Sequence, residues 1–190
     1  RNIFPSNIQG MPTWYELRVS GAGWLGRRGG CDMMVAMNPQ TWDRDVAEVD
    51  AGGYLLYDST KSLPAAKFRD DLQIIGIPFM EMCNARYADA RQRQLLKNIM
   101  YVGALTALLA LDYAEVEKLI AEQYRGKDKL IASNLDALAA GYEHARARFD
   151  GPIGLRVERA DQIGDRIFID GNSAAALGAV YGGATVAAWY

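Results

Sequence analysis

One long uncharged stretch constrains the fold of this chain more than any other feature. Residues 95–111 read LLKNIMYVGALTALLAL, and they carry no charge between Ile99 and Leu111. Apolar side chains point in nearly every direction around the helical wheel, which is typical of a helix covered on several sides. Its 13 uncharged residues fall short of the roughly 20 that span a bilayer. We therefore expect a buried core helix, covered by the rest of the chain, and no membrane partner.

Strand-like segments precede this helix, and amphipathic helices follow it. Strands are expected at residues 1–4, 13–20, 31–37, 54–58 and 71–79, and helices at 42–49, 115–124 and 130–149. Strands separated by short helices predict an α/β fold, with a Rossmann-like mixed or parallel sheet, flanking helices and the buried apolar helix.

The periodicity also predicts which helix positions face solvent. Thr41 is expected to cap the first helix, with Asp43, Asp45 and Glu48 among its exposed positions. The inner stripes of the later helices are expected to include Leu119 and Leu130.

Composition excludes several classes of protein. The net charge of −2, from 21 basic and 23 acidic residues, argues against a general nucleic-acid binder. Cys31, Cys83 and His144 are too few for a zinc or iron–sulfur site with four Cys or His ligands. No signal peptide is recognisable, and free thiols favour a cytoplasmic protein. His144 lies in a charged run, so we expect it at the surface rather than as a catalytic base.

A glycine pattern and two arginines form the candidate ligand-binding segment. Residues 21–26 (GAGWLG) match G-x-G-x-x-G, but a dinucleotide site requires the last glycine to open a helix. The next residues lead into another apolar strand, which favours a hairpin-like connection and leaves NAD binding as a minor alternative. Arg27 and Arg28 can reach a phosphate from this glycine-rich connection. A solvated turn is the alternative.

The C-terminal part does not fit into the same compact unit. Residues 150–154 (DGPIG) resemble a linker, 155–159 and 166–170 are strand-like, and a helix rich in alanine and glycine follows from residue 173. That helix needs packing partners of its own, so we expect a second domain to start near residue 165. Both ends lack the usual stop signals, and we expect a piece cut from a longer polypeptide.

Several motifs, found in order along the chain, resemble the 2-oxoacid:ferredoxin (acceptor) oxidoreductases. Asn98-x4-Gly103, KDKLIASN at 127–134 and Gly141 are similar to the gamma domain of these enzymes. Residues 169–190 look like the start of the alpha (pyrimidine-type) domain in subunits where gamma and alpha are fused. NIQGMPTWYELRVS, at residues 7–20, is similar to fused subunits of the 2-oxoglutarate type.

The resemblance implies a division of the chain. Residues 1–150 would be a gamma domain lacking its first strand, 151–165 a linker, and 166–190 the truncated start of a thiamine-diphosphate-type alpha domain. Coenzyme A contacts would lie at Gln9, Gly10, Arg27 and Arg28. Many relatives carry Arg-Gly-Gly where this chain has Gln9-Gly10-Met11, so the first of these contacts departs from the family pattern.

The resemblance also implies the reaction and the partners. Such enzymes oxidatively decarboxylate a 2-oxoacid, here with 2-oxoglutarate favoured, and use coenzyme A to give acyl-CoA, CO2 and reduced ferredoxin. Thiamine diphosphate and Mg2+ would be held largely outside this chain, and a [4Fe–4S] cluster by a beta subunit or a ferredoxin-like partner. This piece would supply coenzyme A closure and subunit assembly in a hetero-oligomer, with no catalytic residue and no metal ligand. A purely structural interaction domain is the alternative.

Overall fold

The computed structural model describes residues 2–3, 12–23, 26–149, 152–160 and 164–188. Two compact units are present, Arg1–Glu158 and Arg159–Tyr190. The strands of the first unit are β1 (Asn2–Ile3), β2 (Trp14–Tyr15), β3 (Cys31–Ala36), β4 (Val49–Asp58) and β5 (Gln73–Ile77). Its helices are η1 (Pro39–Thr41), α1 (Trp42–Glu48), η2 (Ala65–Lys67), α2 (Phe79–Arg86), α3 (Ala90–Leu108), α4 (Tyr113–Gln123) and α5 (Asp128–Arg148). The second unit contains α6 (Gly171–Tyr181).

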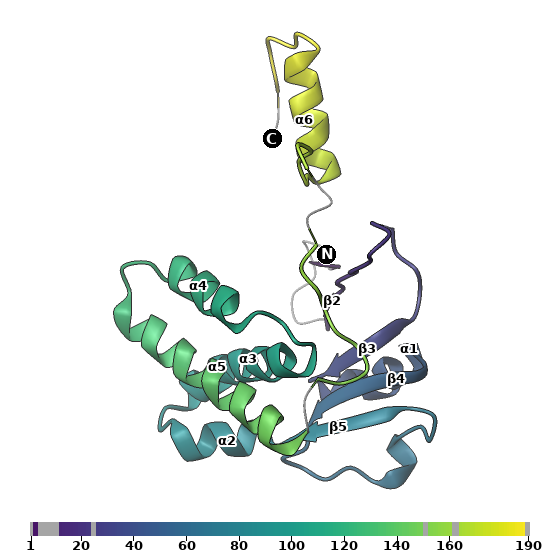
Figure 1. The fold of residues 1–190 in the computed structure, drawn as a ribbon, viewed down its shortest axis with the longest axis vertical. Coiled ribbons are helices and arrows are strands. Elements are labelled where there is room, and N and C mark those ends of the chain that lie inside the picture. The colour runs from purple at the N-terminus through teal and green to yellow at the C-terminus, as the bar shows by residue number, and fades with distance from the viewer. Residues whose placement is uncertain (1, 4–11, 24–25, 150–151, 161–163, 189–190) are drawn as a thin grey trace. The chain divides into compact units, whose positions relative to one another are not determined.

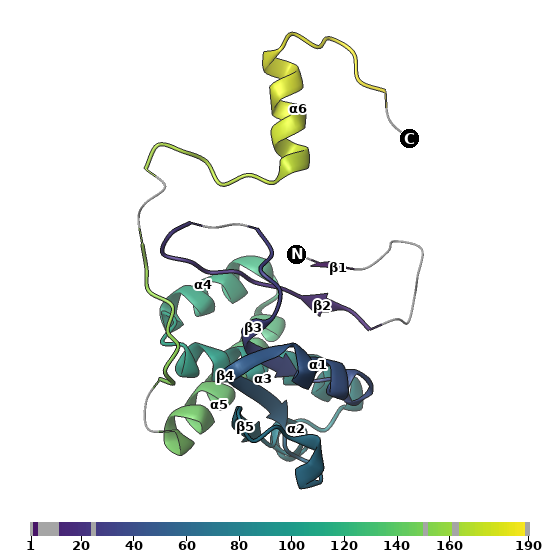
Figure 2. The same cartoon turned by 90° about the vertical axis from the view of Figure 1, so that its right-hand side faces the viewer.

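A parallel sheet in the order β3-β4-β5 forms the centre of the first unit. Successive side chains of a strand point to opposite faces, so the buried neighbours Leu55 and Leu56 of β4 enter two different cores. Leu55 packs with Trp42 of α1, whereas Leu56 packs with residues of α2 and α3. Figures 1 and 2 show α1 on one face of the sheet and α2, α3 and α5 on the other. This arrangement confirms the predicted α/β class.

The predicted core helix is α3, and its buried stripe runs along one side of the helix. Leu96, Met100, Ala104 and Leu108 recur every four residues and are buried, as expected for neighbours on one helix face. Leu95 is exposed, so the start of the predicted stretch faces solvent. The helix ends at Leu108, before the predicted end at residue 111.

Two glycines bring the backbones of α3 and α5 into direct contact. A Cβ atom on Gly103 would lie 2.0 Å from the Leu138 carbonyl oxygen, and one on Gly141 would lie 1.7 Å from the Met100 carbonyl oxygen. Real Cβ atoms essentially never come this close to a backbone atom. Only glycine therefore fits at these two crossing points. Both glycines belong to the motifs that resemble the gamma domain.

The strand expected at residues 13–20 is much shorter than predicted. Only Trp14 and Tyr15 are paired, antiparallel to β1, and Leu17 and Val19 are 76% and 70% exposed. Alternating apolar residues favour a strand only where a neighbouring strand and a covering layer exist. The described part of β1 supplies just two pairing residues.

Asp45 lies in the core rather than on the exposed side of α1. It is only 3% exposed, and its carboxylate accepts hydrogen bonds from the Trp14 indole at 2.7 Å and the Thr41 hydroxyl at 2.7 Å. The Arg44 guanidinium lies 4.1 Å from the centre of the Trp14 ring. A carboxylate is buried at low cost when hydrogen-bond donors face it. This contact attaches β2 to α1.

Leu119 and Leu130 are exposed, contrary to the expected inner stripes. Leu138, also predicted on the inner stripe, is buried as expected. The rest of the buried face of α5 includes Asn134, Ala137, Ala140, Gly141 and Ala145. Because α3 and α5 approach so closely, small residues fill the contact where larger ones were expected.

The described parts of the strand-like segments at 155–159 and 166–170 contain no strand. Residues 152–157, named here the strap, lie along the connection between α3 and α4. The Ile153 and Val157 amides donate to the Leu108 and Leu109 carbonyls, each at 2.9 Å, and the Gly154 amide donates to the Tyr54 hydroxyl at 3.0 Å. These bonds join the strap to the first unit instead of pairing it with a second strand.

In the second unit, α6 begins after Asp170, whose carboxylate accepts from the Ser173 amide at 2.9 Å. Such a side chain satisfies a free amide of the first helical turn. The helix ends at Tyr181, earlier than predicted, and Gly183 follows with a φ of 86°. Across the described residues, no helix is both long and apolar enough to cross a membrane.

Candidate functional site

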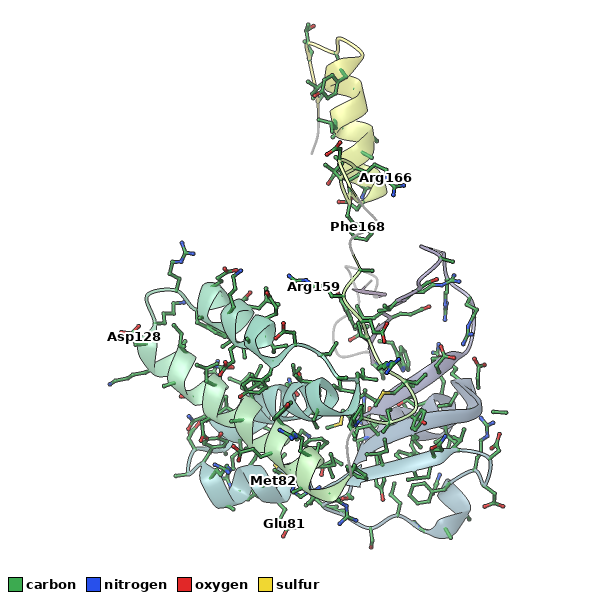
Figure 3. All side chains as sticks on the ribbon, in the orientation of Figure 1. Glu81, Met82, Asp128, Arg159, Arg166 and Phe168 are labelled. Atoms are coloured by element: carbon green, nitrogen blue, oxygen red, sulfur yellow. The ribbon has the colours of Figure 1, made fainter. Side chains whose placement is uncertain are left out.

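A polar cluster lies where β4 ends, at the edge of a parallel sheet where α/β proteins usually bind ligands. Asp58 is the last residue of β4, and its Oδ1 accepts from the Thr60 hydroxyl at 2.6 Å and from the Met80 amide at 3.4 Å. The Thr60 hydroxyl in turn accepts from the amide of Glu81, labelled on α2 in Figure 3, at 3.1 Å. The Asp58 carboxylate therefore satisfies the first turn of α2.

Lys97 of α3 completes this cluster. Its Nζ lies 3.8 Å from Asp58 Oδ2, and the two side chains are 16% and 17% exposed. The cluster joins β4, α2 and α3, and its carboxylate is already engaged on both oxygens. Its clearest role is to fix the position of α2 against the sheet. An aspartate directly after an apolar strand, followed by a threonine, is the sequence signal that would have revealed it.

Arg27 and Arg28, the predicted anion contacts, each face carboxylates. Arg27 Nε lies 3.0 Å from Glu16 Oε2. Arg28 lies 2.5 Å from an Asp50 oxygen and 3.2 Å from an Asp32 oxygen. Both arginine side chains are about half exposed or more. Exposed ion pairs contribute only about 0–1 kcal/mol, so a phosphate could displace these carboxylates at little cost.

Gln9 and Gly10, the other two predicted contacts, lie outside the described residues. In the structure, Arg27 and Arg28 face different carboxylates, and the contribution of residues 9 and 10 stays a prediction.

The glycine pattern at 21–26 leads into a strand, as predicted. Gly23 has a φ of 74°, and its amide donates to the Ser20 carbonyl at 3.1 Å, which closes a turn. The residues described between Gly26 and the start of β3 at Cys31 contain no helix. A dinucleotide site of the Rossmann type places the pyrophosphate on a helix N-terminus, and this segment does not supply one.

The two cysteines do not form a site for an iron–sulfur cluster. Cys83 is fully buried, with its sulfur 3.8 Å from Met100 Sδ, whereas Cys31 is half-buried and packs against the other core. Burial raises the pKa of both thiols, that of Cys31 to about 11 with a further contribution from Asp50. Thiols that stay protonated are poor ligands, and a [4Fe–4S] cluster takes four thiolates, so the chain does not fit this cofactor.

His144 is half-buried rather than at the surface. Its Nε2 is buried and has no hydrogen-bond partner within the described ranges. Burial, and then the charge of Arg148, lower the pKa of its imidazole. As for metal sites, the described residues contain no group of three or more His, Cys, Asp or Glu that could hold an ion.

Comparison with known proteins places this fold among oxidoreductase subunits. The ketoisovalerate oxidoreductase subunit VorA of Methanothermobacter thermautotrophicus is 32% identical over 125 residues, which cover 64% of this chain and 24% of that protein. Subunit alpha of 2-oxoacid:ferredoxin oxidoreductase 2 from Aeropyrum pernix is 23% identical, over 98% of this chain and 35% of that protein. The chain therefore spans between a quarter and about a third of these relatives.

A solved structure has the same fold. The 2-oxoglutarate:ferredoxin oxidoreductase of Magnetococcus marinus, with 2-oxoglutarate, coenzyme A and succinyl-CoA bound, matches 82% of this chain and 27% of its own. The TM-score is 0.66 at 22% identity, so this likeness concerns the fold. Residues 1–144 match the pyruvate ferredoxin/flavodoxin oxidoreductase family. Since that match includes most of the 190 residues, and the relatives are 2-oxoacid oxidoreductase subunits, this chain belongs to the pyruvate ferredoxin/flavodoxin oxidoreductase family.

Proposed function

We propose that this chain is part of a 2-oxoacid:ferredoxin oxidoreductase that converts a 2-oxoacid and coenzyme A into acyl-CoA, CO2 and reduced ferredoxin. The observation that carries the proposal is the family match over residues 1–144. The proposed gamma domain covers residues 1–150, the linker 151–165, and the start of a fused alpha domain 166–190. The break between the two compact units, after Glu158, falls inside the proposed linker and supports this division.

The cofactors of the proposed enzyme lie mostly on other parts of the assembly. Thiamine diphosphate and Mg2+ would be bound with a beta subunit, and the iron–sulfur cluster by that subunit or a ferredoxin-like partner. The buried, protonated thiols described above support the proposal that another part of the assembly holds the iron–sulfur cluster. A hetero-oligomer is part of the same proposal, because the relatives are named as subunits. A cytoplasmic location is proposed on the ground that both cysteines are free.

We expect 2-oxoglutarate to be the preferred substrate of the assembled enzyme. Residues 7–20 resemble subunits of the 2-oxoglutarate type, whereas one relative is named for ketoisovalerate. Acceptor reduction would be measured with 2-oxoglutarate, pyruvate and 2-oxoisovalerate at saturating coenzyme A. A kcat/KM at least about tenfold higher for 2-oxoglutarate, equivalent to about 1.4 kcal/mol in the transition state, would support the preference. A higher value for 2-oxoisovalerate would assign the enzyme to the branched-chain type.

The role of this piece would be to close over coenzyme A. Replacing both Arg27 and Arg28 by alanine in the assembled enzyme should raise the Michaelis constant for coenzyme A by about tenfold, because charge-assisted bonds to phosphate are lost. The Michaelis constant for the 2-oxoacid should not change. Initial rates at varied coenzyme A provide the measurement, and Arg125→Ala, an exposed arginine on another connection, is the matched control. An unchanged constant in the double variant would favour the purely structural role.

A further inference from the structure

Arg28, one of the two arginines proposed to contact coenzyme A, already faces two carboxylates of its own chain. Its guanidinium lies 2.5 Å from Asp50 Oδ2 and 3.2 Å from Asp32 Oδ1. The three groups together carry one positive and two negative charges. All three side chains are about half exposed or more, so a phosphate from solvent can reach them. Such a phosphate would meet an arginine whose hydrogen bonds are already in use.

An irregular part of the sheet brings the carboxylates to this arginine. The register of β3 against β4 shifts between Cys31 and Met33, which includes Asp32, and a shift of this kind changes where side chains point. Gly30 has a φ of 64°, and a Cβ atom there would overlap the Asp50 carboxylate. The missing side chain at Gly30 therefore leaves room for Asp50 beside the arginine.

A thiol beside this group reports the sign of the local electrostatic field. Burial is the largest cause that raises the pKa of Cys31 to about 11. The charges of Asp50, Glu48 and Asp32 also raise this pKa, in decreasing order, whereas Arg28 lowers it by less than any of them raises it. Negative charge therefore outweighs the arginine here, and a phosphate entering the same place meets the same repulsion.

Asp50 is placed to compete with a phosphate for one guanidinium. We propose that the Asp50 carboxylate is a tethered competitor of the coenzyme A phosphates at Arg28, and that it lowers the affinity of the assembled enzyme for coenzyme A. This competition presupposes the proposed function, in which Arg28 contacts coenzyme A. Because exposed ion pairs are weak, we expect the competition to weaken coenzyme A binding by about threefold to fivefold.

The first test replaces Asp50 by asparagine, which keeps the shape of the side chain and removes its charge. In the assembled enzyme, Asp50→Asn should lower the Michaelis constant for coenzyme A by about threefold to fivefold and leave kcat unchanged, as a change in binding alone would. Asp43→Asn is the matched control, because it removes the same charge from an exposed ion pair with Lys67. It should leave the Michaelis constant for coenzyme A unchanged. Calorimetric titration of coenzyme A without a 2-oxoacid should show the same tighter binding by Asp50→Asn.

A double variant shows whether Asp50 acts through Arg28. In the Arg28→Ala background, Asp50→Asn should no longer change the Michaelis constant for coenzyme A, because nothing is left to compete for. The same decrease in both backgrounds would reveal a general effect of charge and would overturn the proposal. So would an unchanged constant in Asp50→Asn, or a higher one, which would mean that Asp50 positions Arg28 for the phosphate. Turnover of the 2-oxoacid that needs no coenzyme A would instead contradict the proposed function itself.

Discussion

Replacing Gly141 by alanine should destabilise the first unit by about 3 kcal/mol or more. The added Cβ would lie 1.7 Å from the Met100 carbonyl oxygen, so α3 and α5 must separate along their whole contact. Overpacking of a core costs typically 1–3 kcal/mol and occasionally more, and the better helix propensity of alanine returns only about 1 kcal/mol. Urea unfolding followed by tryptophan fluorescence would measure the loss, and Gly103→Ala should behave similarly.

Gly21→Ala is the matched control for this experiment. Gly21 has no positive φ, and an added Cβ there would have open space, so its free energy of unfolding should change by less than about 0.5 kcal/mol. Since domains are stable by only about 5–15 kcal/mol, the difference in free energy of unfolding between the two variants should be easy to measure. A Gly141→Ala variant as stable as Gly21→Ala would show that the two helices are not in backbone contact.

Asp58→Ala should lower the free energy of unfolding by about 3 kcal/mol. The change removes the acceptor for Thr60 and Met80 and leaves Lys97, 16% exposed, without its partner. Breaking a mostly buried pair is costly because an uncompensated charge remains. Chemical denaturation gives the magnitude. Adding Lys97→Met should restore part of the loss, since the remaining charge is then also removed.

Asp43→Ala provides the contrast, because its ion pair is shorter but open to water. Asp43 Oδ1 lies 2.7 Å from Lys67 Nζ, and the side chains are 79% and 46% exposed. Exposed pairs of this kind contribute about 0–1 kcal/mol. We therefore expect exposure, rather than distance, to decide which aspartate matters. If both variants lost the same stability, the cluster at the end of β4 would have no special structural role.

The pattern of apolar residues predicted where the helices and strands lie better than it predicted which of their residues are buried. The core helix and the parallel strands were found because each is a long apolar segment with its own periodicity. Asp45 was placed on the wrong side of α1, because its donor Trp14 is 31 residues away in sequence. A carboxylate on a short helix resembles a solvent-exposed residue until that partner is known. The strand predicted through Leu17 and Val19 did not form for a different reason. Their side chains alternate as in a strand, but they are exposed rather than covered by a second layer.

The candidate site, too, was predicted only in part from the sequence. Arg27 and Arg28 were located in a glycine-rich connection from sequence alone, but their acidic partners were not. Asp32 and Asp50 reach Arg28 from β3 and β4, and which residues of two strands lie side by side depends on register.

The hydrogen bonds of the strap also limit the free length of the connection between the first unit and the second. A fully extended chain covers about 3.4 Å per residue, so residues 152–157, if released, would lengthen the connection by about 20 Å. With Ile153 and Val157 bonded to the end of α3, these residues add no free length to that connection. Opening the three hydrogen bonds of the strap would then lengthen the connection without breaking the sheet or the helix contacts of the first unit.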